Sequence, residues 1–343
     1  MTEQFAQHIV NNLLQPKEND VISIAGEIYN LSQNPLVELP LIEEIALNIR
    51  KKKAFPFLEI STENLKHRFF SEMPKEIFAH SPTFYNQWID TISAFIEIGW
   101  KNISGEFSGE NNLYFKQMQS LSEKIWQKIF EQNKKVIFLN FPTNELAEHL
   151  QIDYETLYQI YLAAVLTDHF KLKLKISEIH ELLTKHSKFF LRSETDILNF
   201  SIKHDKLKTF SGKLFEQQPL IVLPTGFVEI PLIRSRLNGT FYAERAYYRN
   251  SSFANIKINF EDGFVRFISV KEESEQSETL KNAVLNSKDE CFLVTGCNEN
   301  ISDYTGYFLY DRCIAENNSV VFYDNNFERI IFSKKNSKIV INE

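Results

Sequence analysis

The sequence predicts a two-domain protein of mixed α and β structure. We expect an N-terminal α/β domain with a parallel sheet over residues 1–150, and a mainly antiparallel α+β domain, begun by connecting helices, over residues 151–343. The length of 343 residues exceeds what one hydrophobic core usually serves. Strand-like and helix-like segments alternate at first, whereas strand-like segments dominate after about residue 189. The 43% of hydrophobic residues include 30 phenylalanines, which predicts aromatic cores.

The N-terminal part alternates short apolar runs with segments of helical periodicity. This alternation is typical of parallel strands that are joined by crossover helices. Strands are predicted at residues 21–25, 55–60, 94–98 and 136–141, and helices at residues 36–52 and about 112–132.

The middle of the chain is predicted to be helical, and the remainder to be mostly strands. Thr143 is a candidate N-cap for the first of these helices. A second, apolar helix is predicted at residues 153–174 and a third at residues 177–187. Asp262-Gly263 predicts a hairpin turn. The segments predicted around it are strands at residues 195–202, 220–224, 239–244 and 254–270, with one helix at residues 274–286.

Charge and composition argue against several classes of partner. The formal net charge is -7 and the basic runs are short, so nucleic acid is not an expected partner. No stretch approaches the ~20 apolar residues of a membrane span, and the first residues lack the pattern of a signal peptide. The three cysteines fit no metal pattern and leave an odd count for disulfides. We therefore expect a cytoplasmic protein without a membrane partner.

Common catalytic and nucleotide-binding motifs are missing from the sequence. No glycine-rich phosphate loop occurs, and GEFSG at residues 105–109 departs from the GxSxG pattern. His180 and His186 lie six residues apart, so a helix would not place them on one face as a zinc motif requires. No histidine follows His204, and the strand-rich part therefore lacks the commonest general base and metal ligand.

Four N-terminal and central segments resemble, in order and spacing, the metallo-aminopeptidases typified by aminopeptidase T and aminopeptidase S. The resemblance runs through nearly the whole chain. It implies a two-domain fold, a homodimer, and two divalent metal ions, zinc or cobalt, held by two glutamates, histidines and an aspartate. The four segments are LLQPKENDVISIAGE, PLVELPLIEEIALNIRKKKAFPFLEIST, SPTFYNQWIDTISAFIEI and FPTNELAEHLQIDYETLYQIYLAAVLTD.

The strand-rich part carries the motifs that would hold the metals, and most of the ligands differ. LPTGFVEIP resembles a turn that bears a ligand glutamate, with Phe227 at the position of that glutamate. FLVTGCN keeps Gly296 and Asn298 of the next motif but has Phe292 at the position of the acid. The segment NGT at residues 238–240 matches the expected continuation of the first turn.

The last two motifs are also altered. Asp311-Arg312-Cys313 stands where the resemblance implies Asp-Glu-Lys, and the histidine-bearing segment that should follow is skipped. VFYDN then offers Phe322 in place of a ligand histidine and keeps Asp324. The resemblance therefore predicts that Phe227, Phe292 and Phe322 converge at one locus, with Asp324 at its edge.

Two functions are compatible with these substitutions. The first is a non-catalytic homologue, with no metal cofactor, retained for binding a peptide or protein or for a structural role. Phenylalanine would then fill a site whose carboxylates repel one another when no metal neutralises them. The second is an active aminopeptidase with a displaced metal site. Glu229 and Glu290 each lie two residues from a substituted position, and with Asp324 they would offer oxygen ligands suited to magnesium or calcium.

Overall fold

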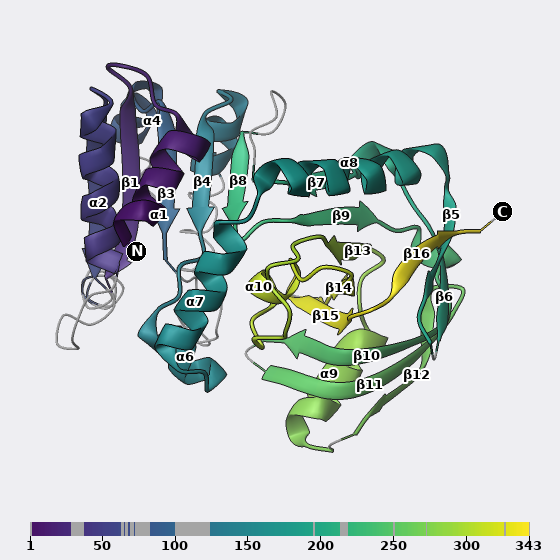
Figure 1. Cartoon of the computed structure of the whole chain (residues 1–343). Helices are drawn as coiled ribbons and strands as arrows, with labels where there is room; N and C mark the ends of the chain where they lie inside the picture. The colour runs from purple at the N-terminus through teal and green to yellow at the C-terminus, as the bar shows by residue number, and fades with distance from the viewer. Residues whose placement is uncertain are drawn as a thin grey trace. The chain divides into compact units, whose positions relative to one another are not determined.

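The chain forms two compact units, which are drawn in Figure 1. The structure is a computed structural model. Unit 1 comprises Met1–Tyr158 and Gly212–Leu223, and unit 2 comprises Gln159–Ser211 and Pro224–Glu343. A single boundary after residue 150 did not anticipate the return of Gly212–Leu223 to unit 1. The residues that the structure describes are 2–28, 38–62, 65, 68, 72, 83–99, 124–194, 196–212, 219–249, 251–271, 273–325 and 327–342.

Unit 1 is built on a parallel sheet that has five strands within the described residues, in the order β2-β1-β3-β4-β8. The predicted parallel sheet is therefore present. The last strand was expected in the antiparallel part, but Leu220 pairs in parallel with Val136. A continuous apolar run is typical of a strand in a parallel sheet. The strands are β1 (Val21–Ile28), β2 (Phe55–Thr62), β3 (Ala94–Ile98), β4 (Lys135–Leu139) and β8 (Leu220–Leu223).

Helices cover both faces of the unit 1 sheet. On one face α2 packs so closely that a Cβ on Gly26 would lie 2.7 Å from Ile42. The other face packs Phe95 and Val136 against Ile89 of α4. The helix predicted from about residue 112 falls partly outside the described residues, which are helical over 124–131. The remaining helices of this part are α1 (Thr2–His8), the π-helical η1 (Ile9–Leu14), α2 (Glu38–Lys51), α4 (Thr83–Thr91) and α6 (Asn144–Leu150).

The caps of the central helices explain where each one begins. The Thr143 hydroxyl accepts a hydrogen bond from the Leu146 amide at 3.1 Å, as predicted. The single helix expected over residues 153–174 is instead divided into α7 (Tyr154–Val165) and α8 (His169–Lys185). Asp168 causes the break, because its carboxylate accepts from the amides of Phe170 and Lys171 and so begins a new helix.

Unit 2 is built on a curled antiparallel sheet that contains eleven strands within the described residues (Figure 1). The predicted turn at Asp262-Gly263 is confirmed, with φ of 49° and 80°. Helices α9 (Glu275–Leu285) and α10 (Phe308–Asp311) accompany the sheet. Its strands are β5 (Lys188–Arg192), β6 (Ile197–Ser201), β7 (Lys208–Phe210), β9 (Phe227–Pro231), β10 (Asn238–Tyr248), β11 (Ser251–Glu261), β12 (Phe264–Val270), β13 (Cys291–Gly296), β14 (Asn318–Tyr323), β15 (Arg329–Lys334) and β16 (Lys338–Ile341).

The sheet of unit 2 has an apolar core on each of its two faces. Successive residues of a strand point to opposite faces, so β9, β13, β14, β15 and β10 contribute to both cores. What we call the Phe322 face packs against α8 and α9 and includes Val228, Leu293, Phe322, Ile330 and Phe332. What we call the Phe227 face includes Tyr247, Phe227, Val294, Val321 and Ile331, packed against Ile301, Phe308, Cys313 and Ile314.

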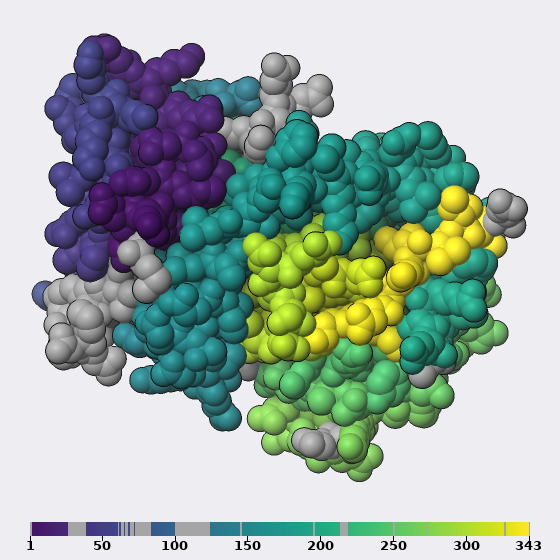
Figure 2. Space-filling view, viewed as in Figure 1, coloured from purple at the N-terminus to yellow at the C-terminus, as the bar shows by residue number. Residues whose placement is uncertain are grey.

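The surface of unit 2 seen in Figure 2 shows where the C-terminal strands run. The last part of the chain, in yellow, crosses this surface between α8 and the strands β10 to β12. None of the described helices is both long enough and apolar enough to cross a membrane.

Candidate functional site

The turn before β9 brings the backbone of three segments together. Gly226 has φ of 109°, and its amide donates to the Phe210 carbonyl at 2.9 Å. The Thr225 hydroxyl donates to the same carbonyl at 2.9 Å. A Cβ on Gly226 would lie 2.9 Å from the Cβ of Asn298, so the turn requires glycine for space as well as for conformation.

Asn298 holds this turn against its neighbours. Its Nδ2 donates to the carbonyl oxygens of Ala164 at 2.8 Å and of Thr225 at 3.1 Å. The nearby Gly296 has no room for a side chain, because a Cβ there would lie 2.0 Å from the carbonyl oxygen of Ile314. Gly296 and Asn298 therefore have structural roles here.

Phe227 and Phe292 lie on the same face of the sheet. Phe227 is opposite Gly296 and Phe292 is opposite both Pro231 and Val321, which places all of these residues on one side. Phe227 is fully buried and stacks on Phe210, with ring centroids 4.4 Å apart. Phe292 is half-buried and meets Tyr323 edge to face, with centroids 6.0 Å apart.

Phe322 lies on the opposite face, so the expected convergence of three phenylalanines is wrong. It pairs with Cys291, packs 5.7 Å from Phe260 and 6.3 Å from Phe332 between ring centroids, and belongs to the core of the Phe322 face. Val321 and Tyr323 occupy the Phe227 face instead. Successive residues of a strand point to opposite faces, so Phe322 cannot share a face with Phe292, which is paired with Val321.

Asp324 stabilises a hairpin and a tyrosine on the Phe322 side of the sheet. It is 5% exposed and follows β14 directly. Its carboxylate accepts from the Glu328 amide at 2.8 Å and from the Tyr248 hydroxyl at 2.9 Å. Burial and this carboxylate raise the pKa of Tyr248 to about 12. Asp324 is thus hydrogen-bonded away from Phe227 and Phe292.

The three carboxylates considered for a displaced metal site do not come together. Glu229 lies on the Phe227 face opposite Val294, Asp324 lies on the other side, and Glu290 is exposed before β13 begins. Among the described residues, no group of three or more His, Cys, Asp or Glu side chains is arranged to hold a metal ion. The geometry therefore contradicts the displaced carboxylate site.

The residue that the sequence interpretation missed is Arg312. Its guanidinium carbon lies 4.1 Å from the centre of the Phe227 ring, and the residue is only 5% exposed. Burial lowers the pKa of this guanidinium, while Glu229 acts in the opposite direction and Arg329 adds to the lowering. The sequence showed Arg312 in place of an expected glutamate, but nothing in that pattern indicated that its side chain would cover Phe227.

Arg312 is incompletely paired for so buried a charge. Its Nε makes no hydrogen bond within the described part of the chain, and none of the ion pairs formed by the described residues includes it. Polar groups that act on the pKa of Arg312 include Cys313, Glu229 and Tyr307. A buried ionic group without full compensation carries a large desolvation cost.

Asp311 fixes the loop that presents Arg312. Its fully buried carboxylate accepts from the Tyr247 hydroxyl at 2.7 Å, from the amide and hydroxyl of Thr305 at 2.7 and 2.8 Å, and from the Gly306 amide at 3.0 Å. Burial raises the pKa of Asp311 to about 6, and these hydrogen bonds oppose the rise. These contacts tie the loop to Tyr247 of β10.

The cysteines are small core residues, as expected. Cys291, Cys297 and Cys313 are free and buried, and burial raises the pKa of each thiol to about 12. Their thiolates are therefore scarce near neutral pH.

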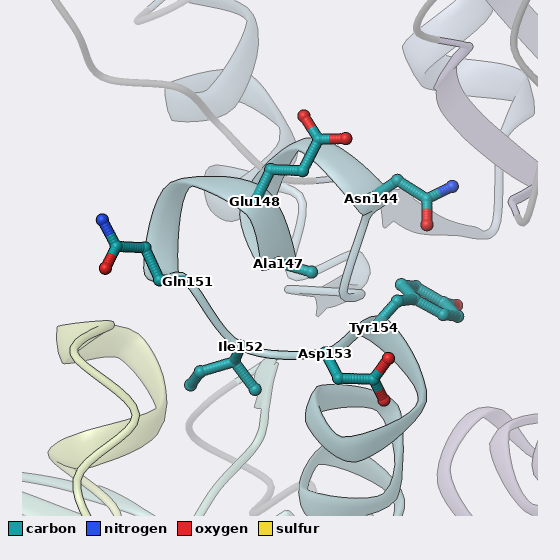
Figure 3. Close-up of a pocket in the computed structure, with 7 residues that line it drawn as sticks. All are labelled: Asn144, Ala147, Glu148, Gln151, Ile152, Asp153 and Tyr154. Atoms are coloured by element: carbon teal, nitrogen blue, oxygen red, sulfur yellow. The ribbon is translucent and has the colours of Figure 1, made fainter.

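A shallow depression in unit 1 lies at the turn between α6 and α7 and has a volume of about 590 Å³. In Figure 3, Glu148 and Gln151 point away from each other rather than toward a common centre. Asp153 caps α7, since its carboxylate accepts from the Thr156 amide at 3.0 Å. This depression lacks the convergent polar groups of a binding site.

The fold is shared with two solved structures, although the sequences differ greatly. No protein-family model and no curated protein sequence matches this chain. It is similar to wild-type AmpT from Thermus thermophilus, an aminopeptidase T, with a TM-score of 0.63, 14% identity, and coverage of 94% of this chain and 85% of that one. It is also similar to 2,5-dihydroxypyridine dioxygenase from Pseudomonas putida KT2440, with a TM-score of 0.61, 12% identity, and coverage of 99% and 93%. The mixed α/β fold is therefore aminopeptidase T-like.

Proposed function

We propose that this protein is a non-catalytic homologue of the dinuclear-metal aminopeptidases that binds a peptide or a protein. The observation that carries the proposal is the guanidinium of Arg312, 4.1 Å from the centre of the Phe227 ring. By the resemblance, the side chain at position 227 should be a metal ligand. A permanent cation lies against that position instead.

Charge repulsion makes this position unfavourable for a metal. A divalent ion about 4 Å from a guanidinium would be opposed by about 8 kcal/mol at an effective dielectric constant of about 20. Metal-dependent peptide hydrolysis needs an ion that is firmly held and keeps an open coordination position for water. Neither Phe227 nor Phe292 supplies a ligand.

The phenylalanine at position 227 stabilises the folded protein through the burial of its apolar surface. Complete burial of a phenylalanine contributes about 1.5–3 kcal/mol, and Phe227 is 0% exposed. Phe292 is only half-buried and gains less. The full burial of Phe227 and the partial burial of Phe292 support a face that is packed at one end and open to a ligand at the other.

The fold alone selects no activity. One similar structure is an aminopeptidase and the other a dioxygenase, so different functions are built on this architecture and the site must decide. No arrangement of the described residues favours the alternative of an active aminopeptidase with a displaced metal site.

Aminopeptidase activity is the direct test. The purified protein is assayed with a panel of aminoacyl amides in added zinc, cobalt, manganese or magnesium, and its metal content is determined by elemental analysis. We expect background hydrolysis and no stoichiometric metal. The matched variant is Glu229→Gln, since Glu229 lies on the Phe227 face and was a candidate ligand of the displaced site. Metal-dependent turnover in the wild type that is lost in this variant would overturn the proposal.

Peptide binding is tested separately, by titrating the protein with a library of short peptides at equilibrium. We expect saturable binding without cleavage. A library in which no peptide binds at millimolar concentration would contradict the peptide-binding role.

We also propose a cytoplasmic location and a homodimer, both on the basis of the expectations from the sequence and the resemblance. Light scattering coupled to size-exclusion chromatography tests the dimer, and a monomer at micromolar concentration would contradict it.

A further inference from the structure

The Phe227 face contains a buried cation, Arg312, which forms no ion pair with the residues that the structure describes. Two charged side chains, Glu229 and Arg329, act on Arg312. The negative charge of Glu229 raises its pKa and the positive charge of Arg329 lowers it.

We propose that Arg312 anchors a binding site for a carboxylate on the Phe227 face. The guanidinium is planar and presents paired N–H donors, which match the two oxygens of a carboxylate. Phe227 supports the guanidinium on one side. The Nε makes no hydrogen bond within the described residues, so the protein itself does not use all of the donors of this guanidinium.

The surroundings specify the rest of the ligand. Phe292 and Tyr323 are both half-buried on the same face as Phe227, where they meet edge to face. Half-buried aromatic rings on the face that carries this cation suit a ligand that has an apolar or aromatic body and a carboxylate at one end. Two sources share this chemistry: a small aromatic acid and the C-terminus of a peptide. For a peptide, the inference rests on the proposed function.

Glu229 gives the site a distinctive response to mutation. It is half-buried on the same face and its negative charge opposes the approach of another anion. Removal of this charge should strengthen carboxylate binding, whereas removal of the Arg312 charge should abolish it. A purely structural role for the two residues predicts no such opposite effects.

The experiment measures binding of benzoate by calorimetry, with benzamide as the neutral match. We expect benzoate to bind the wild type and Arg312→Met to bind at least about tenfold more weakly, as for the loss of a hydrogen bond to a charged group. Glu229→Gln should bind benzoate a few-fold more tightly. The control is Arg266→Met, which removes an exposed arginine paired with Glu261 on another hairpin and should bind as the wild type does.

Arg312→Lys keeps the charge but not the planar guanidinium group. It should bind benzoate with intermediate affinity, and it replaces Arg312→Met as the test if that variant is poorly folded.

The tripeptide Ala-Ala-Phe and its amide distinguish the two sources of the carboxylate. Tighter binding of the free acid than of the amide assigns the site to peptide C-termini, and binding of benzoate alone assigns it to small acids. Failure of both acids to bind, equal binding of benzamide, or equal binding of benzoate to Arg312→Met would overturn the proposal. Benzoate has no peptide bond, so its result stands apart from any hydrolysis that would overturn the proposed function.

Discussion

The two faces of the unit 2 sheet each contain a phenylalanine with an arginine over its ring, but the arginines are paired very differently. On one face, the Arg234 guanidinium carbon lies 5.2 Å from the centre of Phe322, and its nitrogens donate to the carbonyls of Gly263, Ser287 and Lys288 and to the Ser287 hydroxyl. On the other, Arg312 lies 4.1 Å from the centre of Phe227 and its Nε has no partner within the described residues. Arg234 is half-buried, whereas Arg312 is 5% exposed.

The contrast separates a structural charge from one that we assign to function. A protein normally satisfies a guanidinium more completely as it becomes more buried, because the cost of an unpaired charge rises with burial. Arg234 follows this rule and Arg312 breaks it. Positions where local rules are broken without compensation are often functional sites.

The largest expected loss of stability comes from removing the ring of Phe227 or of Phe322. Phe227 and Phe322 are each 0% exposed, so substitution of either by alanine leaves a cavity and should lower the free energy of unfolding by about 3–5 kcal/mol. Phe292→Ala should cost clearly less because Phe292 is half-buried. Urea denaturation of the three variants measures this, and an equal loss in all three would show that the Phe227 face is closed throughout.

The Phe227 face should also contribute a pH dependence to stability. The pKa of Asp311 is raised from 3.8 to about 6 in the folded protein. The folded state therefore retains the proton when the unfolded state has lost it, so this contribution to stability is complete below pH 3.8 and is lost as pH rises through 6. The loss is about 3 kcal/mol. Asp311→Asn, compared with the wild type by denaturation between pH 4 and 7, should remove this part of the slope; an unchanged slope would contradict it.

On the Phe322 face, Arg234→Met should lower the free energy of unfolding by about 2 kcal/mol. The variant leaves the carbonyls of Gly263, Ser287 and Lys288 without this donor. A hydrogen bond to a charged group contributes about 1.5–3 kcal/mol. Because Arg234 is half-buried, water replaces part of the lost bonds and the net loss is close to that of one bond. Thermal and urea unfolding measure the change. Wild-type stability in this variant would remove the distinction between the two arginines.

A smaller loss of stability is expected when either of two neighbouring tyrosines, which point to opposite faces of the sheet, is replaced. Tyr247 donates to Asp311 at 2.7 Å and Tyr248 donates to Asp324 at 2.9 Å. Replacement of either by phenylalanine should lower the free energy of unfolding by about 1.5 kcal/mol. Equal values would show that both aspartates are structural, and a neutral Tyr248→Phe would contradict the structural role of Asp324.

The sequence predicts the elements better than it predicts which of them meet. Periodicity located β1, α2 and α9, and the candidate cap Thr143 located the start of α6. Strand β8 was placed in the wrong sheet, because a short apolar run does not reveal its pairing partner. Phe322 was placed on the wrong face, because short motifs do not fix the register of a strand, and one residue of difference in register reverses the face of a side chain. Arg312 was visible only as a missing glutamate, since its contact with Phe227 joins residues that are far apart in the chain.

The central claim is that Arg312 is retained in spite of its cost to the folded protein, and the stability of Arg312→Met tests it most directly. Methionine has a similar length and no charge, and replacement of an uncompensated buried ion by an apolar side chain is often neutral or stabilising. Urea denaturation of Arg312→Met should therefore give a free energy of unfolding equal to or above that of the wild type, beside the loss expected for Arg234→Met. A loss in Arg312→Met as large as that in Arg234→Met would show that Arg312 is an ordinary structural residue and would contradict the account.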